Sequence, residues 1–423
     1  MSFCNIIQRF NRRILRPRPL SSLSQVPFIQ PSPLLSRFYA NSTFRSPSLQ
    51  PLTNLLIGIT AYGFLFGTLY ILHENYKKYK ISYANKAIQK GTIPEMNISS
   101  DKFYPRSQVL EKLKKLFTPQ KYFQSCHIIY GKHGIGKSTL IKMASKEIGQ
   151  GVIYVDIPSN IEDFGKNFAK AMNIKMSNLA YDTYNDRDNL LGKALQVFER
   201  AAKDYKAKYG KPLVIIYDNV DRLIPKNIKI VDRLQNNAIY GNNENYISVF
   251  VSSEYLIPQR MDSRAHWENL DYFEIGELTK EESIDYLVNK KNIKKEEAKK
   301  IYELVGGCII DLEKVADDLF SGQSFEDIKK KIKIEVGKKF RIAKLMPGDR
   351  YYESGRNIIN ALLNSKELSR SELRKFSIYL YNEDYKELMD KNIFEYHPKT
   401  HKITFESKLI EYYIRENADL FIK

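Results

Sequence analysis

The sequence predicts an α/β protein in which helices cover a parallel sheet, and two observations support this fold class. Short, β-prone apolar runs alternate with helical stretches over the first part of the folded region. These runs are residues 126–130, 152–157, 213–217, 246–252 and 272–275. After Gly276 the strand-like runs stop and helical patterns continue from Lys280 to Ile342, which predicts a separate helical domain beside the sheet.

Length and composition are those of an ordinary globular protein. The chain has 423 residues, of which 43% are hydrophobic and 27% charged, enough for two or three domains. Its 3 cysteines cannot build a disulfide framework. The net charge of +18 suits anionic lipid, nucleotide or nucleic acid and does not choose among them.

The N-terminal segment has the composition of a mitochondrial presequence. From Met1 to Ser48 the chain contains seven arginines, many serines and prolines, and no acidic residue. Residues 3–15 place apolar side chains on one helical face and arginines on the other, and Arg37-Phe38-Tyr39-Ala40 resembles a processing site. We therefore expect a presequence over residues 1–39, the alternative being a disordered basic tail.

Residues 52–72 form an uncharged run of 21 residues. At 1.5 Å per residue this length matches a hydrocarbon layer of about 30 Å, so we expect one transmembrane helix; the alternative is a buried helix of a soluble protein. Gly63 and Gly67 form a GxxxG pair, which lets two such helices approach closely, so a homo-oligomer and a monomer are both open. The lysine-rich linker at residues 73–102 favours the inner membrane with the soluble domain in the matrix, although stop-transfer import would leave that domain in the intermembrane space.

A phosphate-binding loop follows the first strand-like run. The sequence from Gly131 to Ser138 reads GxxxxGKS, and apolar residues then recur at helical spacing, which supplies the strand, loop and helix that the motif requires. The loop glycines allow main-chain amides to turn toward phosphates at a helix N-terminus. The predicted ATP-binding residues are Gly131, Lys132, His133, Gly134, Ile135, Gly136, Lys137, Ser138 and Thr139. We expect Lys137 to reach the β- and γ-phosphates and the Ser138 hydroxyl to ligate Mg²⁺.

The second acidic element of such a site is expected at the end of the run at residues 213–217. Asp218 ends that run and is the predicted Walker B aspartate, which holds Mg²⁺. The next residue is Asn219, where many P-loop ATPases have a glutamate that polarises the attacking water. Asp221 either takes that catalytic role or caps a helix, or hydrolysis is slow and nucleotide acts as a switch.

Three further residues are weaker candidates for contacts with the γ-phosphate. Ser252 stands at the end of the strand predicted at residues 246–252, where a polar side chain either senses phosphate or caps the strand. Arg260 and Arg264 follow shortly afterwards. Each of these two arginines is either an arginine finger or an ordinary surface residue.

The C-terminal residues 352–423 predict a winged-helix domain: three helices near residues 355–363, 369–377 and 383–392, and a hairpin at residues 393–396 and 402–405. The expected recognition helix is net negative, since it carries Glu383, Asp384, Glu387 and Asp390. A negative helix matches nucleic-acid phosphates poorly, so we expect contact with a protein partner rather than nucleic acid.

Residues 103–420 resemble the STAND/AAA+ superfamily of P-loop ATPases, especially the archaeal-type ATPase branch with a C-terminal winged helix. Besides the Walker motifs, three segments carry the resemblance: Phe103–Phe117, Glu277–Leu287 and Leu304–Ala316. In the last, Ile309 or a neighbour replaces an expected proline near the adenine. The resemblance implies an ASCE-type sheet domain at residues 103–276 whose Walker B strand lies beside the P-loop strand, and a helical lid at residues 277–345 that holds nucleotide against it.

The sequence thus predicts a mitochondrial membrane-anchored ATP-binding protein with Mg²⁺ as cofactor. The resemblance implies an ATPase or an ATP-controlled switch that acts on a protein partner. Two alternatives are a membrane tether for mitochondrial nucleic acid through the winged-helix domain and a nucleotide-binding scaffold with weak or no hydrolysis.

Overall fold

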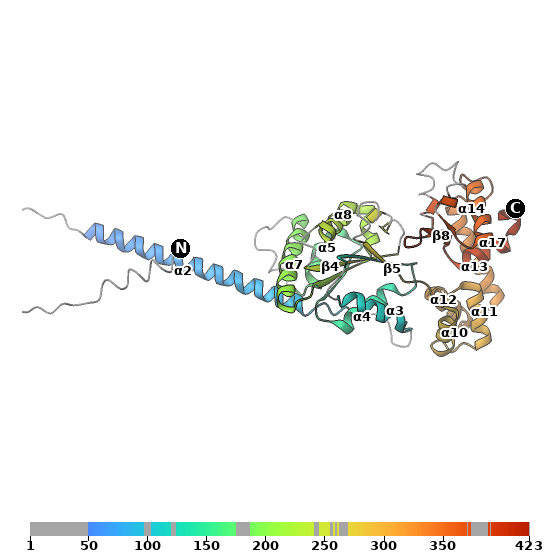
Figure 1. Cartoon of the computed structure of the whole chain (residues 1–423), viewed down its shortest axis with the longest axis horizontal. Coiled ribbons are helices and arrows are strands. Elements are labelled where there is room, and N and C mark those ends of the chain that lie inside the picture. The colour runs from blue at the N-terminus through green and yellow to red at the C-terminus, as the bar shows by residue number, and fades with distance from the viewer. Residues whose placement is uncertain are drawn as a thin grey trace, which may run out of the picture. The chain divides into compact units, whose positions relative to one another are not determined.

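The structure is a computed structural model of the chain (Figure 1). It describes residues 50–96, 103–119, 124–174, 187–240, 245–253, 257–258, 260–261, 270–369, 371–373, 388–389 and 391–422. The expected presequence at residues 1–39 lies outside these ranges. The chain divides into two units, Met1–Leu72 and His73–Lys423, and the nucleotide-binding motifs belong to the second.

Helix α2 (Gln50–Gln89) contains the transmembrane segment expected at residues 52–72 and continues into the linker. Within this one helix the apolar residues are followed by polar and charged ones from His73 onward. Among the residues that the structure describes, no helix is long and apolar enough to cross a membrane. The structure therefore does not support the expected membrane span.

A five-stranded parallel sheet forms the centre of the second unit. Its strands are β1 (Cys126–Tyr130), β2 (Val152–Asp156), β3 (Leu213–Asp218), β4 (Tyr246–Ser252) and β5 (Leu270–Glu274). The order is β2-β3-β4-β1-β5, and every adjacent pair is parallel. The predicted strands are thus confirmed, but the expectation that the Walker B strand lies beside the P-loop strand is wrong. Ser248 of β4 pairs with Cys126 of β1 on one side and Ile215 of β3 on the other, so β4 separates them.

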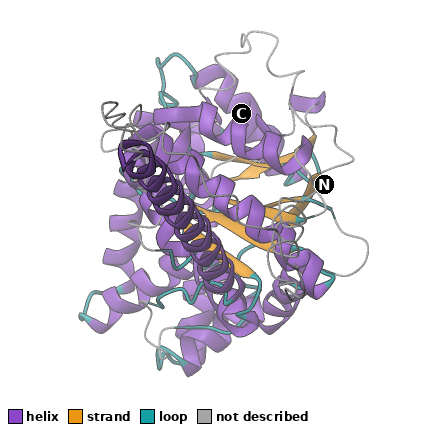
Figure 2. Cartoon of the chain, turned by 90° about the vertical axis from the view of Figure 1, so that its left-hand side faces the viewer, coloured by secondary structure: helices purple, strands orange, loops and turns teal. Residues whose placement is uncertain are grey.

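Helices pack on both faces of this sheet, and Figure 2 shows the strands enclosed between them. One face is covered by α3 (Ser107–Phe117) and α4 (Lys137–Ile148), whose apolar side chains join the core around Ile129 and Val249. The other face is covered by three helices with a core that includes aromatic rings in stacked and edge-to-face contact. These helices are α5 (Phe164–Ala171), α7 (Arg187–Tyr209) and α8 (Ile224–Tyr240).

The predicted helical region after the sheet is confirmed. It consists of α10 (Lys280–Asn289), α11 (Lys295–Val305), α12 (Ile309–Phe320) and α13 (Phe325–Ile342). Its first helix begins at a capping box, because the Thr279 hydroxyl accepts from the Glu282 amide while the Glu282 carboxylate accepts from the Thr279 amide. We call these four helices the lid.

The C-terminal region contains α14 (Tyr352–Ser365), α17 (Lys408–Glu416), α18 (Ala418–Phe421) and an antiparallel sheet. The sheet order is β6-β8-β7, from β6 (Leu368–Ser369), β8 (Lys402–Phe405) and β7 (Phe394–His397). The expected hairpin is therefore present. Most of the two expected helices between residues 369 and 392 lies outside the described residues, so the winged-helix assignment stays a prediction.

The lid and the C-terminal region share one hydrophobic core. Phe340 of α13 contacts Tyr413 of α17 and Phe421 of α18, with ring centroids 5.0 Å and 4.9 Å away. All three aromatic side chains are buried in this core, which is separate from the two cores of the sheet. Because side chains from both segments interdigitate, the lid and the C-terminal region pack as one body.

Candidate nucleotide-binding site

The loop between β1 and α4 adopts a conformation that only glycine accommodates easily. Gly131, Gly134 and Gly136 all have positive φ, at 155°, 87° and 86°. A Cβ on Gly131 would also lie 2.2 Å from the Ile275 carbonyl oxygen. The helix begins at Lys137, and within the described residues the amides of residues 136–139 donate to no main-chain acceptor. These donors at a helix N-terminus are available to an anion, as the sequence predicts.

Lys137 lies inside this loop. Its ammonium group donates to the carbonyl oxygens of Gly131, at 2.6 Å, and Lys132, at 2.8 Å, and the residue is only 6% exposed. Burial lowers the pKa of Lys137 to about 8, although Asp221 and Asp218 act in the opposite direction. A phosphate group in the loop would supply the negative charge that this desolvated ammonium group lacks.

Asp218 stands at the end of β3 and is fully buried. The Tyr154 hydroxyl donates to its Oδ2 at 2.5 Å, and the Ser138 hydroxyl also bonds to its carboxylate. Burial raises the pKa of Asp218, and these two hydrogen bonds lower it in part. The structure therefore brings a hydroxyl and a carboxylate together across three strands, and Mg²⁺ prefers such oxygen ligands. Ser138 and Asp218 thus fit the metal that the motif implies.

Asn219 shapes the turn after the Walker B aspartate. It has a left-handed conformation, with φ 61° and ψ 44°, which asparagine tolerates better than most other residues. Its side-chain amide donates to Oδ1 of Asp156 at 2.8 Å, and Arg222 contacts the same oxygen at 3.0 Å. The position that carries a glutamate in many P-loop ATPases is therefore used here to connect the ends of β2 and β3.

Asp221 is also engaged by the protein. One of its carboxylate oxygens accepts from the Ser252 hydroxyl, and the other accepts from the Ser253 amide at 2.9 Å. Asp221 lies within a short 3₁₀ helix whose N-cap position is occupied by Asn219, so the expectation that Asp221 caps a helix is wrong. Ser252 is buried, and its hydroxyl is hydrogen-bonded to Asp221. This favours a structural role for Ser252 over phosphate sensing.

Arg260 makes a two-pronged ion pair with Asp232, with nitrogen–oxygen distances of 3.0 Å and 2.8 Å. Because Asp232 holds the Arg260 guanidinium group, the structure does not support Arg260 as an arginine finger for the nucleotide bound by the same chain. Arg264 lies outside the described residues.

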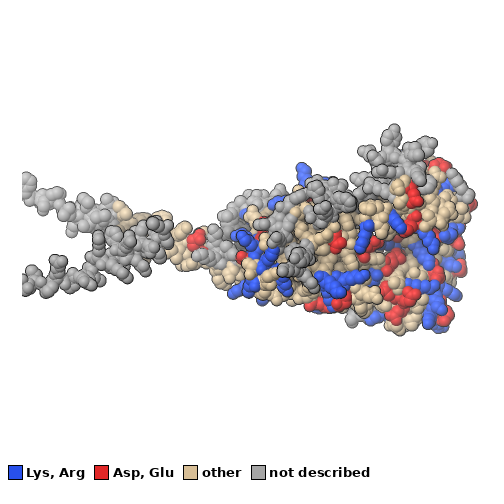
Figure 3. Space-filling model, in the orientation of Figure 1, with Lys and Arg blue, Asp and Glu red and all other residues tan. Residues whose placement is uncertain are grey.

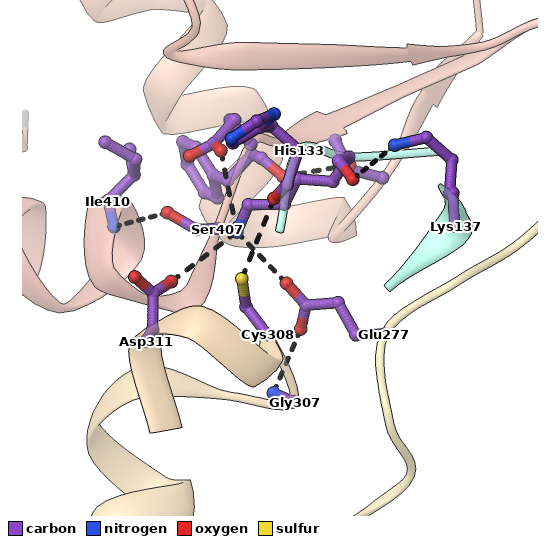
Figure 4. A network of polar contacts seen from close by, with 12 residues as sticks. His133, Lys137, Glu277, Gly307, Cys308, Asp311, Ser407 and Ile410 are labelled. Atoms are coloured by element: carbon purple, nitrogen blue, oxygen red, sulfur yellow. Dashed lines mark hydrogen bonds and ion pairs between the residues drawn. The ribbon is translucent and has the colours of Figure 1, made fainter. Parts of the chain in front are cut away.

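The lid contacts the phosphate-binding loop directly. The Ile310 amide donates to the Gly134 carbonyl oxygen at 3.3 Å, and Cys308 Sγ lies 3.8 Å from the His133 carbonyl oxygen. A Cβ on Gly134 would lie 2.9 Å from the Ile310 side chain, so the lack of a side chain permits this approach. Figure 4 shows Cys308 and Gly307 at the start of α12 close to His133 and Glu277. The segment from Leu304 to Ala316 therefore lies at the loop, in keeping with the expected lid.

Lys132 joins three separate segments. Its Nζ lies 3.1 Å from Glu277 before the lid, 3.5 Å from Glu406 after β8 and 4.0 Å from Asp311 in α12. Its side chain is only 9% exposed. Burial alone would lower the pKa of Lys132, but Glu406 and Glu277 raise it above its ordinary value. We call these four residues the Lys132 cluster.

The hairpin of β7 and β8 also reaches the P-loop strand. His397 Nδ1 lies 2.8 Å from Glu274 Oε1, and the Tyr130 hydroxyl donates to Glu274 Oε2 at 2.8 Å. The Lys399 amide donates to the Tyr130 hydroxyl at 3.4 Å. The Glu395 carboxyl group interacts electrostatically with His397 and Glu274 and also with Lys132 and Glu406.

These elements enclose a cavity of about 730 Å³, which we call the chamber. Its walls come from the P-loop, the turn after β3, the start of α12 and the hairpin. The lining includes Gly131, Lys132, His133, Asn219, Asp221, Ser253, Ile310 and Glu395. The chamber therefore borders the first residues of the loop, where a γ-phosphate would lie.

Arg106 holds the connection between the sheet and the lid. Its guanidinium group donates to the Gly276 carbonyl oxygen at 2.6 Å and to the Glu277 carbonyl oxygen at 3.1 Å, and the residue is 7% exposed. It also lies 3.8 Å from the Glu282 carboxylate. The arginine in the segment from Phe103 to Phe117 thus fixes the main chain at the point where the lid begins.

Comparison with known families decides the assignment. The family model for an ATPase domain predominantly from Archaea matches residues 103–315, half of the chain. The chain belongs to this ATPase family. The match covers the P-loop, Asp218 and most of the lid, so ATP is the nucleotide that the family supports.

Among solved structures, the Walker-type ATPase of Pyrococcus abyssi aligns with 14% identity and a TM-score of 0.48, over 74% of this chain and 96% of that one. The ORC1 protein of Aeropyrum pernix in complex with DNA aligns with 13% identity and a TM-score of 0.38, over 80% and 97%. Cdc6p of Pyrobaculum aerophilum aligns with 13% identity and a TM-score of 0.38, over 79% and 98%. The search of curated proteins gave no match.

The sequence of this ATPase-family chain predicted the loop residues and Asp218 but not several of the residues that the structure places beside them. Tyr154 was missed because a tyrosine in a buried strand usually serves the core. Glu395 and Glu406 were missed because they lie far along the chain in a hairpin that was assigned to a partner surface. The available signal was a single acidic residue, Glu395, between the apolar Phe394 and Tyr396 of a predicted strand.

Proposed function

We propose that this ATPase-family chain is an ATP-controlled conformational switch that binds Mg·ATP and acts on a protein partner in mitochondria. One observation carries the proposal: the lid and the C-terminal region both contact the P-loop, through Ile310 and Glu406. A nucleotide that enters the loop meets residues from both, so its presence alters contacts that hold the lid and the C-terminal region in place.

The residues of the loop account for binding. The amides of residues 136–139 and the Lys137 ammonium group provide donors and positive charge for the β- and γ-phosphates. Ser138 and Asp218 would hold Mg²⁺, which neutralises phosphate charge when it is bound. Tyr154 keeps Asp218 oriented toward Ser138 through its hydrogen bond.

The lid and the C-terminal region share one core, so they are expected to respond together. The connection to the sheet domain runs from Ile275 to Thr279, and Arg106 holds two of its carbonyl groups. A change in the loop contacts of Lys132 or Ile310 would therefore be transmitted to the position of this whole body. Such a movement changes which surface is offered to a partner.

The binding part of this proposal is tested with Lys137→Ala in the full chain. Affinity for a fluorescent ATP analogue is measured by titration with and without Mg²⁺, and Lys146→Ala is the matched control, since Lys146 is an exposed lysine on the same helix. We expect Lys137→Ala to weaken binding at least about tenfold, because a charge-assisted contact contributes about 1.5–3 kcal/mol. Equal affinity for the wild type and Lys137→Ala would remove the assignment.

The switch is tested by hydrogen exchange of the full chain with and without Mg·ATP. Exchange in the hairpin and in the first turn of α12 is expected to change on binding, while the far side of the lid stays constant. No change in either segment at saturating nucleotide would contradict the switch.

A second candidate is a nucleotide-binding scaffold with weak or no hydrolysis. The observation that favours it is that the residues after β3 are engaged by the protein. Asn219 is an amide bound to Asp156, and the Asp221 carboxylate accepts hydrogen bonds from the end of β4. ATP binding without measurable turnover would support this candidate over an ATPase.

The nucleic-acid tether has less support. On the face shown in Figure 3, basic and acidic side chains of the second unit lie interspersed. Much of the basic surface of α13 is paired, as in Lys331 with Asp318 and Lys333 with Glu416. Salt-sensitive binding of duplex DNA by the full chain would revive this alternative.

The mitochondrial location rests on the acid-free, arginine-rich residues 1–39. We expect these residues to direct a fluorescent reporter into mitochondria, and a version with Arg9, Arg12 and Arg13 changed to glutamate to stay outside. A reporter that remains in the cytosol with the natural segment would refute the location.

A further inference from the structure

The hydrolysis of ATP needs a group that positions the attacking water, and the end of β3 provides none in this chain. Asn219 is an amide held by Asp156, and both oxygens of Asp221 accept hydrogen bonds from the end of β4. In P-loop ATPases a polar or acidic side chain near the γ-phosphate performs this task. A different part of the chain would have to supply it.

Glu395 is placed to do so. It lies in β7 between Phe394 and Tyr396, whose side chains are buried in the core of the C-terminal body. Because side chains alternate along a strand, Glu395 points to the opposite side, and it lines the chamber together with Gly131, Lys132 and His133. Its carboxylate therefore shares a cavity with the γ-phosphate end of the loop.

Contacts on both sides hold this strand in place. After Glu395, His397 binds Glu274 and the Lys399 amide binds the Tyr130 hydroxyl. Directly after the neighbouring strand β8, Glu406 pairs with Lys132. The position of Glu395 is thus fixed by contacts with β5, with β1 and with the P-loop, whereas a residue on an exposed loop would not be positioned so well.

The surroundings of Glu395 suit proton transfer. Burial raises the pKa of its carboxyl group to about 7, with Glu406 and Glu274 adding to the rise and His397 and Lys132 opposing it. Among the described residues, no hydrogen bond contributes to this shift. A base acts best when its pKa lies near the working pH, and an uncommitted carboxylate can accept a hydrogen bond from water.

We propose that Glu395 of the C-terminal hairpin is the carboxylate that orients and deprotonates the water attacking the γ-phosphate of ATP. This rests on the proposed function of the P-loop. The water oxygen forms a bond to the γ-phosphorus while the bond from that phosphorus to the bridging oxygen of ADP breaks. The water proton passes to Glu395 and then to solvent, and the products are ADP and phosphate. Hydrolysis thereby requires the docked hairpin, so the C-terminal region completes the catalytic site in its own chain.

The opposite role is that the Glu395 carboxylate excludes the triphosphate and keeps the protein inactive. The two roles predict opposite effects for Glu395→Gln, which removes the charge and keeps the shape. If the carboxylate excludes ATP, this variant binds ATP more tightly and turns it over at least as fast as the wild type.

The test uses the full chain with wild type, Glu395→Gln and the control Glu367→Gln. Glu367 is an exposed carboxylate at the edge of the same small sheet, where it pairs with Lys402. ATP affinity is measured by titration and hydrolysis by single-turnover kinetics from pH 5.5 to 9. We expect Glu395→Gln to lower the hydrolysis rate by about 100-fold or more with ATP affinity changed less than about threefold. The fall in rate below an apparent pKa near 7 should be present in the wild type and the control and absent from the variant.

The variant Glu395→Asp guards against a folding defect. It keeps a carboxylate on a shorter side chain, so a reduced rate with the acidic fall in rate retained is expected, and thermal unfolding shows whether each variant is folded. Wild-type hydrolysis rates in Glu395→Gln, faster hydrolysis in it, or a wild type that binds ATP without hydrolysing it would each overturn the proposal. None of these outcomes contradicts the proposed binding of ATP by the P-loop. That proposal is refuted only if Lys137→Ala binds ATP as tightly as the wild type does.

Discussion

The Lys132 cluster offers a direct test of how the lid and hairpin are held to the phosphate-binding loop. Lys132→Met removes the ammonium group and keeps a side chain of similar length. It leaves Glu277, Asp311 and Glu406 near one another without the shared cation. We expect the contacts of the lid and the hairpin with the loop to weaken while the sheet domain stays folded.

The size of the effect follows from burial. Removal of one partner of a fully buried ion pair costs about 3–5 kcal/mol. Here the Glu277, Asp311 and Glu406 side chains are 32%, 25% and 15% exposed to solvent, so water screens part of the lost ion-pair energy. We therefore expect about 2–3 kcal/mol, which corresponds to a factor of about 30–150 in the equilibrium between docked and undocked hairpin.

Hydrogen exchange at the amides of the hairpin measures this equilibrium, because local opening exposes them. Protection should fall by the stated factor in Lys132→Met, with little change in β3 and β4. The control is Lys280→Met, because Lys280 pairs with Glu303 on the surface, with exposures of 50% and 58%, and water screens such an exposed pair so that it contributes little. Unchanged hairpin protection in Lys132→Met would refute the reasoning that this buried cation holds the three segments together.

Three further predictions follow from other contacts. Tyr154→Phe removes the hydroxyl that lowers the pKa of buried Asp218, so the Mg²⁺ concentration for half-maximal ATP binding should rise about tenfold, with Tyr209→Phe as an exposed control. Gly134→Ala puts a Cβ 2.9 Å from Ile310 at a φ of 87° and should weaken ATP binding about tenfold or more in titrations, whereas Gly210→Ala, at a φ of 70° with open space around it, should leave ATP binding intact. The hydrogen bond to Glu274 and the charges of Glu395 and Glu274 outweigh burial and raise the pKa of His397 above 6.5, so docking of the hairpin should be strongest below pH 6.5 and weaken as the pH rises through the raised value. Protection factors of the hairpin amides, that is, exchange rates corrected for the intrinsic rate at each pH, that do not change between pH 6 and 9, or that keep the same pH dependence in His397→Gln, would contradict the last prediction.

Local patterns were sufficient to predict most elements of this fold. The five strands, the lid helices and the C-terminal hairpin were all predicted within a few residues, because each has a strong apolar period or a turn signal at its ends. Lys137, Ser138 and Asp218 were predicted together because phosphate and Mg²⁺ chemistry restricts the residue types at the ends of β1 and β3. The strand next to the P-loop strand was predicted wrongly, since the order of strands depends on pairing over long distances in sequence.

The sequence by itself determined the phosphate-binding loop, because a helix N-terminus with glycines before it needs only consecutive residues to form. Only the tertiary structure decided what surrounds that loop. Glu395 and Glu406 lie more than 250 residues beyond the loop, and Tyr154 comes from a strand three places away from β1 in the sheet. Side chains so distant in sequence meet only because parallel strands end at one edge and because the lid and C-terminal region share a core, and neither condition leaves a local pattern in the chain.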